Sequence, residues 1–524
     1  MSLRSGKSIR QLFFILVILV LLSTCWYALQ FTLAVRYVVS HEASEETAMS
    51  RVMNNKNDEA TLKEQVLRIW MEAIVIKNRI ESYLAQIPST IMDSLWLWWW
   101  KLFKKLDINK ISVHTNVTSA VTEDTLFIYK AFLDQRKSEE PLIRVLAFGQ
   151  CREIQVLLRY GKFLISVKEV TVEYHCPWQW APYCKWFSFM LVFSLSNTNF
   201  STDTDHIFLM KRNQIITVPL KILPQQYEDT LHVCVPPLYW YWNYVALIQF
   251  IEIWSKQGAT VFHIYYVSVN QHTMDILKIY ERMGIIRLIR WQMLPRSDLT
   301  DPNRWIYRFG HTLSMNDCLY TSTAKYVALV DTDEFIIPNS GTLLPFLREA
   351  HNLNGLAGSF VFEHAKVRFP GWKEFELQPK LDFFWLKNAE FHLQRGPSKT
   401  VFMPERVQII VTHTVREFLK PYKPFIVWIF PFNLFHCKFF SLKLFQQYVS
   451  LLNTKYQILM SKVPWPEQNL IPCWKDHSKT IEGCLSKWRL YGCKAPYHLC
   501  VSDLHDKDEW IFSHVNVSSD YILF

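Results

Sequence analysis

The chain has 524 residues, and its 57 Lys and Arg against 47 Asp and Glu give a formal net charge of +10. Half of the residues are hydrophobic and 15% are aromatic, which supports a large folded core and excludes a mainly disordered or fibrous protein. The positive charge forms no dense basic block, so no nucleic-acid partner is expected. Gly numbers only 13, and no G-x-G-x-x-G or P-loop pattern occurs, which disfavours a Gly-rich nucleotide loop.

Residues 12–35 form an apolar segment without formal charge, which is long enough to cross a bilayer. Basic residues precede this segment and acidic residues follow it, so the positive-inside bias leaves residues 1–11 in the cytoplasm. A cleaved signal peptide is the alternative, but its apolar core is usually only about 7–15 residues long. The sequence therefore predicts a single-pass type II anchor in a secretory-pathway membrane, with the rest of the chain in the lumen.

The cysteines and the N-glycosylation motifs agree with a lumenal location. Cys25 lies in the apolar segment, and ten further Cys follow it, the last four close together without paired C-x-x-C zinc spacing. Disulfides are therefore expected rather than a structural metal site. Glycosylation motifs occur at Asn116, Asn199 and Asn516, all beyond the anchor.

Two regions separate the anchor from the next strong signal. Within the stem, 36–121, apolar residues recur at alternating spacings of four and three over 61–87, which predicts an amphipathic helix. That helix pairs two chains as a coiled coil, giving a homodimer, or packs on its own chain; both interpretations stay open. Short β-rich runs with polar or Pro-containing turns then predict a small all-β accessory module over 122–229.

From Leu231 onward, strand and helix patterns alternate. The apolar run ending in Val233–Val235 is a strand, and the expected elements after it are a helix at 241–257, a strand at 260–267, a helix at 273–283 and a strand at 285–291. This β-α-β-α-β order predicts an α/β fold with a parallel sheet, in which ligands bind beyond the carboxyl ends of the strands. A further helix at 309–322 precedes a strand at 326–330.

This last strand runs into an acidic cluster, Asp331-Thr332-Asp333-Glu334. In extended backbone, residues two apart point to the same side, so Asp331 and Asp333 are expected to face one ion. Mg²⁺ and Mn²⁺ prefer such oxygen ligands, and a bound cation stabilises a departing diphosphate. A D-x-D triplet alone is common by chance. Its position at the end of a buried strand in a βαβ unit favours the metal-site interpretation.

Several blocks of the chain, in order, resemble the glycosyltransferase family 92 domain over about Leu231 to Leu452. They are Val233–Tyr239, Phe250–Ala259, Phe309–Leu319, Val330–Pro338 and Lys399–Val407, with His413 shortly after. The resemblance implies a GT-A-like fold, a Rossmann-like mixed sheet with covering helices. It also implies metal-dependent, inverting transfer of a hexose, galactose from UDP-galactose, onto a glycan acceptor in the Golgi.

The resemblance also suggests roles for individual residues. Metal ligands are expected at Asp331, Asp333 and, as the late His of GT-A enzymes, His436; donor contacts are expected from Asp317, Lys399 and Lys438. The family commonly has Gln at the position of His311 and Arg at that of Lys438, where Lys loses the planar fork that grips phosphate. Glu363 is the preferred base, with Glu334, Asp382 and Glu390 as competitors. Trp305, Trp372 and Trp385 either stack on sugars or belong to the core.

The catalytic domain is therefore expected over 230–460 and a Cys-rich, disulfide-stapled tail over 461–524. Three alternatives remain open. A catalytically degenerate lumenal glycan-binding or scaffold protein would keep this fold. A metal-dependent phosphodiesterase would need further Asp or His ligands. An anchored adhesion protein would explain the Cys and glycosylation motifs but not the βαβ series that ends in the acidic cluster.

Overall fold

The computed structural model describes residues 121–137, 140–160, 163–196, 204–338, 341–364, 366–368, 383–392, 397–427, 445–464, 480, 483–484, 493, 504, 509–514 and 518–524. The chain divides into two compact units, Met1–Ile111 and Ser112–Phe524, and all described residues belong to the second. The predicted cytoplasmic tail, the anchor, the stem helix and the Asn residues of all three glycosylation motifs lie outside the described residues. Among the helices that are described, none is long and apolar enough to cross a membrane.

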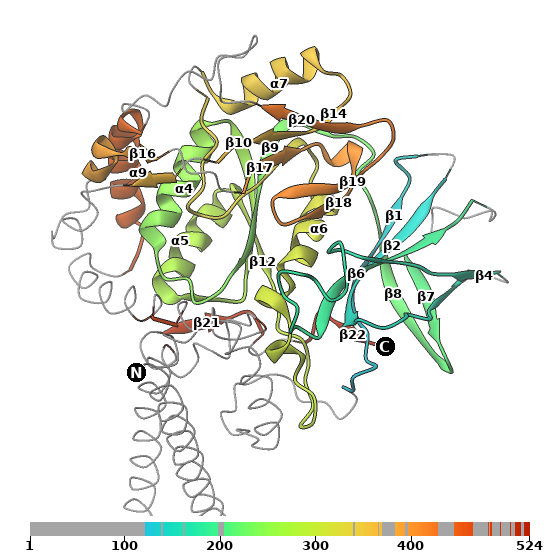
Figure 1. Cartoon of the computed structure of the whole chain (residues 1–524). Coiled ribbons are helices and arrows are strands. Elements are labelled where there is room, and N and C mark those ends of the chain that lie inside the picture. Colours follow the sequence, from blue (N-terminus) through green and yellow to red (C-terminus); the bar gives the residue numbers. More distant parts are fainter. Residues whose placement is uncertain are drawn as a thin grey trace, which may run out of the picture. The chain divides into compact units, whose positions relative to one another are not determined.

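A first sheet is built almost entirely from the region 127–222 (Figure 1). Its strands follow the order β4-β3-β7-β8-β1-β2-β6-β5, and β22 pairs with β1. Their bounds are β1 Phe127–Asp134, β2 Leu142–Gln150, β3 Leu157–Tyr160, β4 Phe163–Ser166, β5 Lys168–Thr171, β6 Trp186–Ser194, β7 His206–Lys211, β8 Gln214–Ile222 and β22 Ile522–Leu523. Throughout, we refer to this as the β-rich sheet.

A second, seven-stranded sheet has the order β12-β10-β9-β13-β17-β14-β20. Its strands are β9 Glu228–Leu238, β10 Ala259–Tyr266, β12 Ile286–Arg290, β13 Ala324–Leu329, β14 Ala357–Phe362, β17 Lys399–Phe402 and β20 Lys423–Val427. Strands β12, β10, β9 and β13 are parallel, and β17 runs antiparallel to both β13 and β14. Consequently β13 and β14 end at the same edge of this mixed sheet.

The helices are α4 Tyr244–Lys256, α5 Gln271–Arg282, α6 His311–Thr321, α7 Leu343–Leu353 and α9 Val449–Met460. The Asn243 side chain caps α4 and the Asn270 side chain caps α5, each accepting a backbone hydrogen bond in the first turn. Gly258, with φ +100°, follows α4 and permits the left-handed conformation there. The predicted β-α-β-α-β order and the mixed α/β class are confirmed, with ends shifted by a few residues.

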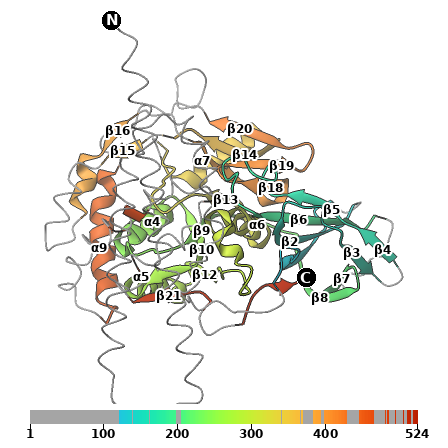
Figure 2. The same cartoon turned by 60° about the horizontal axis from the view of Figure 1, so that its bottom comes forward.

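Helices cover both faces of the mixed sheet (Figures 1 and 2). Alternation along β9 sends Val233 and Val235 into the core shared with α4 and α5, and Cys234 into the core shared with α6. The disulfide Cys234–Cys318 then ties β9 to α6. Strand β9 also continues through Pro236 and Pro237 to Leu238, beyond its predicted end.

The β-rich sheet and the mixed sheet share one of the buried hydrophobic clusters of the described residues. Phe127 and Trp186 of the β-rich sheet lie in the same buried cluster as Trp291 and Leu313. The predicted boundary at 229/230 falls inside β9, so it does not separate two independent units. A mostly apolar sheet face must be buried against another layer, and here that layer contains α6.

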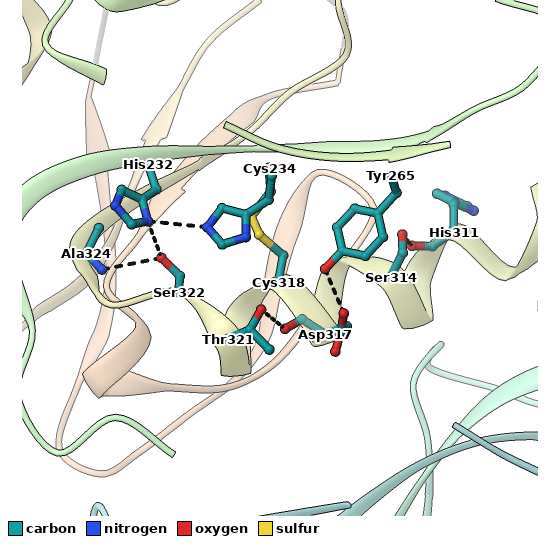
Figure 3. Close-up of a disulfide and its surroundings, with 11 residues drawn as sticks. His232, Cys234, Tyr265, His311, Ser314, Asp317, Cys318, Thr321, Ser322 and Ala324 are labelled. Atoms are coloured by element: carbon teal, nitrogen blue, oxygen red, sulfur yellow. Dashed lines mark hydrogen bonds between the residues drawn. A yellow bond between two sulfur atoms is a disulfide. The ribbon is translucent and has the colours of Figure 1, made fainter. Parts of the chain in front are cut away.

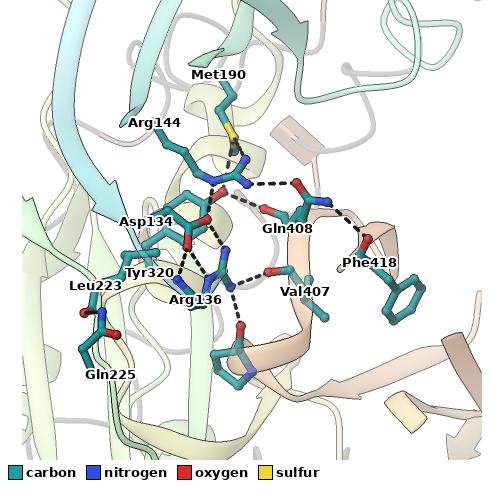
Figure 4. A network of polar contacts seen from close by, with 11 residues as sticks. Asp134, Arg136, Arg144, Met190, Leu223, Gln225, Tyr320, Val407, Gln408 and Phe418 are labelled. Carbon is teal, nitrogen blue, oxygen red and sulfur yellow. Dashed lines mark hydrogen bonds and ion pairs between the residues drawn. The ribbon is translucent and has the colours of Figure 1, made fainter. Parts of the chain in front are cut away.

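A buried polar network crosses the same interface (Figure 4). The Asp134 carboxylate accepts hydrogen bonds from Arg136 at 2.8 Å and from Arg144 at 2.7 Å. Arg144 also donates to the Gln408 side chain at 2.9 Å, and Arg136 donates to the Val407 carbonyl at 2.6 Å. Although burial opposes its ionisation, the two guanidinium groups hold the pKa of Asp134 well below its usual range.

The described parts of the C-terminal region, where a disulfide-stapled tail was predicted, pack onto the rest of the fold. Strand β21, Trp510–Phe512, pairs with β11, Ser268–Asn270. Strand β22 pairs antiparallel with β1 of the β-rich sheet. Disulfides join Cys184 to Cys493 and Cys151 to Cys176, which confirms the expectation of disulfides for these residues. Two further pairs of short strands are β15 Lys366–Arg368 with β16 Glu390–His392, and β18 Val407–Val411 with β19 Thr414–Phe418.

Candidate active site

The acidic cluster forms a turn immediately after β13. The Glu334 backbone N–H donates to the Asp331 carbonyl at 3.1 Å, and the Asp331 N–H donates to the Glu334 side chain at 2.9 Å. The prediction that Asp331 and Asp333 continue an extended strand is therefore wrong, because β13 ends at Leu329. The chain must reverse at the edge of the sheet, and this turn, rather than strand alternation, sets the positions of the two carboxylates.

Both aspartates of this acidic turn, 331–334, remain accessible. The Asp331 side chain is 49% exposed, and Asp333 is also exposed. The surrounding protein partly desolvates the Asp333 carboxylate, and this desolvation is the larger cause of its raised pKa. The negative charge of Asp331 is the second cause. The two carboxylates thus interact electrostatically at one accessible place.

Lys399 is a basic residue that contacts the acidic turn. As the first residue of β17 it pairs with Phe362 of β14, while its neighbour Thr400 pairs with Leu329 of β13. Its ammonium lies 2.6 Å from Glu334 Oε1 and 3.6 Å from Asp331 Oδ2. Burial and the charge of Asp331 raise the pKa of Glu334 to about 7, against the opposing effect of Lys399. Lys399 is therefore buried and paired at the sheet edge.

His413 reaches the same ammonium from a hairpin. It is the second residue of the two-residue loop between β18 and β19, with φ +77°, a region that Gly or Asn usually occupies in such loops. Its Nδ1 lies 3.0 Å from Lys399 Nζ. Burial, and then the charge of Lys399, lower the pKa of His413 to about 4, so its neutral ring accepts this hydrogen bond. An imidazole held in uncommon backbone geometry suggests a functional role.

Arg308 adds a second positive charge that the sequence did not identify. It lies in the short helical turn Tyr307–Gly310, where residues 308, 309 and 310 all have positive φ. Although burial opposes its charge, Tyr239, Tyr307 and Asp331 raise the pKa of Arg308. The turn requires Gly310, because a Cβ there would lie 2.2 Å from the Phe148 ring. In the sequence, the Phe309-Gly310 dipeptide could have indicated this turn, but it does not show the direction of the Arg308 side chain.

The predicted base, Glu363, follows β14 directly and is exposed. Because β13 and β14 both end beside the start of β17, Glu363 lies on the same sheet edge as the acidic turn. Its neighbour His364 interacts electrostatically with Lys399 and Asp333; burial and then Lys399 lower the pKa of His364. The competing Glu390 is an exposed residue of β16.

Asp317 occupies a different environment (Figure 3). Its side chain is 1% exposed on α6, and both carboxylate oxygens lie 2.8 Å from Lys130 Nζ. The Tyr265 hydroxyl donates a further hydrogen bond at 2.8 Å. These contacts give Asp317 a structural role between the two sheets, and they do not support the predicted nucleoside contact.

The other predicted residues are placed as follows. His311 is buried, and its Nε2 lies 2.8 Å from Thr412 Oγ1 in the hairpin that carries His413. Trp385 is 1% exposed and belongs to the core, while Trp305 is partly buried beneath the Lys185 ammonium. The remaining predicted site residues, His436, Lys438, Asp382 and Trp372, lie outside the described residues.

The acidic turn fits a hard divalent cation only in part. Two accessible carboxylates suit a Mg²⁺ or Mn²⁺ ion that keeps several of its waters. Within the described ranges, no group of three or more His, Cys, Asp or Glu is placed to hold a metal ion. Among the described residues, Asp331 and Asp333 would therefore be the ligands of such an ion. His436 is the candidate third ligand.

Comparison with known proteins finds matches to the part of the chain that carries this site. Residues 229–470 match the family model described as Glycosyltransferase family 92. Two Caenorhabditis elegans proteins, each named glycosyltransferase family 92 protein, are 23% identical to this chain over 216 and 239 residues. These alignments cover 39% and 44% of this chain and 41% and 44% of the relatives, so the chain spans less than half of each relative's length.

The crystal structure of S. aureus TarS 1-349 is also similar to part of the chain, at 15% identity. The match covers 26% of this chain and 35% of that chain with a TM-score of 0.17, a likeness that carries no argument about the fold. The family match, by contrast, includes every residue of the acidic turn together with Lys399, His413 and Arg308. Residues 229–470 of this chain therefore form a region that matches glycosyltransferase family 92.

Proposed function

We propose that this protein is an inverting glycosyltransferase that moves a hexose, galactose from UDP-galactose, onto a glycan acceptor. One observation carries the proposal: the accessible acidic turn lies at the carboxyl end of β13 inside the family 92 region, with Lys399 3.6 Å from Asp331. Ligands of open α/β sheets bind beyond the carboxyl ends of the strands. The donor diphosphate would therefore meet this turn.

The charges at the turn suit a diphosphate that becomes more negative as it leaves. Asp331, Asp333 and His436 would hold a divalent cation, Mn²⁺ or Mg²⁺, which when bound supplies Lewis-acid stabilisation of the leaving group. Lys399 and Arg308 place two positive charges near Asp331, and fixed charges of this kind favour the developing phosphate charge. Lys438 is a further proposed phosphate contact.

Glu363 is the proposed general base. It would accept the proton of the acceptor hydroxyl while that oxygen forms a bond to the anomeric carbon from the face opposite UDP. The bond from the anomeric carbon to the phosphate oxygen then breaks, and UDP leaves with the bonding electron pair. Support for Glu363 comes from its exposed position after β14, on the same edge as the acidic turn. Glu334 is less suited, because it accepts hydrogen bonds from Lys399 and from the Asp331 backbone.

We also propose a single-pass type II location in the Golgi membrane, with residues 36–524 in the lumen. The apolar segment 12–35 and the glycosylation motifs of the sequence support this location, as do the disulfides that join distant parts of the fold. A homodimer formed through the stem helix 61–87 remains part of the proposal.

The test uses the full chain in detergent, Mn²⁺ and a panel of UDP-sugars. We expect release of UDP from UDP-galactose, loss of this activity with EDTA, and a fall of at least about 100-fold for Asp333→Asn, the scale expected for removing electrostatic stabilisation. Asp298→Asn, at another exposed position of the same unit, is the matched control and should retain activity. Wild-type turnover in Asp333→Asn would refute the metal role.

One observation favours a second candidate, a catalytically degenerate glycan-binding or scaffold protein. The Lys399 ammonium already pairs with Glu334 and lies near Asp331, so it offsets part of the negative charge of the turn without a metal. Titration calorimetry with UDP decides between the two candidates. Binding that requires Mn²⁺ supports the enzyme, whereas no UDP binding with or without Mn²⁺ supports the scaffold.

A further inference from the structure

Three large aromatic side chains in one segment of the β-rich sheet region are at least half exposed. Tyr174, Trp180 and Tyr183 are 50%, 50% and 61% exposed, and all three lie in the segment between β5 and β6. Exposed aromatic surface gathered in one segment is typical of a binding surface, because burying it in the core would otherwise stabilise the fold. We name these three residues the aromatic shelf.

The segment that carries the shelf is firmly held. The Trp180 ring stacks on Trp178 at 5.5 Å and 19°, and Trp178, only 7% exposed, meets the Tyr307 ring edge-on at 5.2 Å. The disulfides Cys151–Cys176 and Cys184–Cys493 hold the part of this segment that carries Trp180 and Tyr183. A ligand that binds preorganised rings loses little free energy to ordering them, so the shelf is suited to recognition.

Hydrogen bonds tie the same segment to the family 92 domain. The Arg416 guanidinium, on β19, donates to the carbonyls of Val172 and Glu173 at 3.0 and 2.8 Å, and also to that of Thr171. Arg416 also lies over the Tyr174 ring, with its Cζ 5.5 Å from the ring centroid. The hairpin that carries His413 therefore also positions the start of the shelf segment.

The shelf is continuous with the candidate active site. The Trp180 ring centroid lies 6.4 Å from that of His413, and His413 Nδ1 lies 3.0 Å from Lys399 Nζ. Lys399 in turn lies 3.6 Å from Asp331. Among the described residues, His413 and Lys399 thus connect the exposed indole to the acidic turn by a chain of contacts. A molecule resting on Trp180 would have one end next to the reacting groups.

We propose that the aromatic shelf binds the acceptor glycan, with one pyranose ring stacked on Trp180. The C–H groups on one face of a pyranose pack against an indole, while its hydroxyls stay hydrated or bind polar groups at the edge. A donor diphosphate requires charge, which the acidic turn, Lys399 and Arg308 provide, whereas the shelf itself consists of uncharged rings. This assignment of the acceptor rests on the proposed transfer reaction.

The test measures glycan binding without turnover, so it does not depend on the donor. The full chain in detergent is applied to an array of defined N-linked, O-linked and glycolipid glycans. We expect the wild type to bind a subset of these glycans, Trp180→Ala to lose at least tenfold in apparent affinity, and Trp180→Tyr to recover part of the loss. Phe208→Ala is the matched control, because Phe208 is 40% exposed on β7 of the same sheet.

UDP-galactose hydrolysis and the melting temperature are measured in parallel for each variant. Both should stay near wild type in the control Phe208→Ala, and the melting temperature of Trp180→Ala shows whether that variant keeps its fold. Equal glycan binding by Trp180→Ala and wild type would overturn the proposal, as would the absence of any bound glycan. Trp180-dependent sedimentation with phosphatidylcholine vesicles and no glycan binding would identify a lipid contact and also overturn it. If glycan binding requires Trp180 but the wild type does not hydrolyse UDP-galactose, the proposed transfer reaction is refuted and the glycan site is not.

Discussion

Lys130 and Asp317 form an ion pair that links β1 of the β-rich sheet to α6, with the Lys130 ammonium 2.8 Å from each carboxylate oxygen. The residues are 187 positions apart in the chain, and Asp317 is 1% exposed in its side chain. Tyr265 donates to the same carboxylate. A buried carboxylate with three such hydrogen bonds fixes α6 against β1, next to the disulfide between β9 and α6.

Replacing Lys130 should therefore destabilise the fold without a direct effect on donor binding. In Lys130→Met the buried Asp317 carboxylate keeps its hydrogen bond from Tyr265 but loses its ion pair. We expect the free energy of unfolding to fall by about 3 kcal/mol. This value is at the lower end for a broken buried ion pair, because Lys130 is 22% exposed. Differential scanning calorimetry should show a melting temperature lower by a few degrees. Lys168→Met, at an exposed position of β5, should leave it unchanged. An unaltered melting temperature in Lys130→Met would contradict the structural role of the pair.

Two buried histidines should make the fold sensitive to mild acid. His232 Nδ1 lies 3.0 Å from Ser322 Oγ and 3.3 Å from His263 Nε2. Burial lowers the pKa of His232 to about 4 and that of His263 to about 3, with smaller contributions from neighbouring positive groups. In the unfolded chain both would titrate near their ordinary pKa of about 6.5. The unfolded state therefore binds protons first, and stability present above pH 6.5 is lost as the pH falls toward 4.

His263→Leu tests this prediction by removing one titrating group. Between pH 7 and pH 4.5 its loss of stability should be smaller than that of the wild type by about 2–3 kcal/mol. His175→Leu, at an exposed position, is the matched control and should follow the wild type. Melting temperatures measured across this pH range give the comparison. Parallel pH profiles for His263→Leu and wild type would show that the pair does not control acid stability.

Lys399→Met should lower the catalytic efficiency with UDP-galactose and raise the affinity of the site for Mn²⁺. Loss of a charged contact to phosphate, worth about 1.5–3 kcal/mol, should lower kcat/KM for UDP-galactose by roughly 10- to 150-fold. Removing the ammonium also leaves Asp331 and Glu334 without their partner, so the Mn²⁺ concentration for half-maximal activity should fall. The exposed Lys420→Met is the control. An unchanged kcat/KM for Lys399→Met would remove Lys399 from the donor site.

Glu363→Gln should affect the chemical step alone. An amide cannot accept the acceptor proton, and general-base catalysis contributes about 10²–10⁴-fold, so kcat should fall by this range. The KM for UDP-galactose should stay within a factor of two or three, because Glu363 carries no proposed donor contact. Steady-state kinetics with both substrates varied would separate the two parameters, with Glu349→Gln on the exposed face of α7 as the control. A raised donor KM with normal kcat would assign Glu363 to binding instead.

Local patterns in the sequence determined the order of strands and helices and the presence of an acidic cluster after β13. These features depend on neighbouring residues: apolar periodicity, the Gly residues that follow α4 and α5, and carboxylates that end an apolar run. The family 92 blocks were visible for the same reason, since each is short and continuous. Lys399 and the acidic turn could therefore be named as candidates from the sequence.

Only the tertiary structure decided which of these candidates meet. Asp317 lies within a family block, yet it binds Lys130 of the β-rich sheet, whereas Lys399 and His413 reach the acidic turn from another strand and a hairpin. Trp180 joins them from a region whose sequence carried no catalytic signal. Contacts between residues far apart in the chain depend on how sheets and loops pack, and residue spacing along a sequence does not encode that distance.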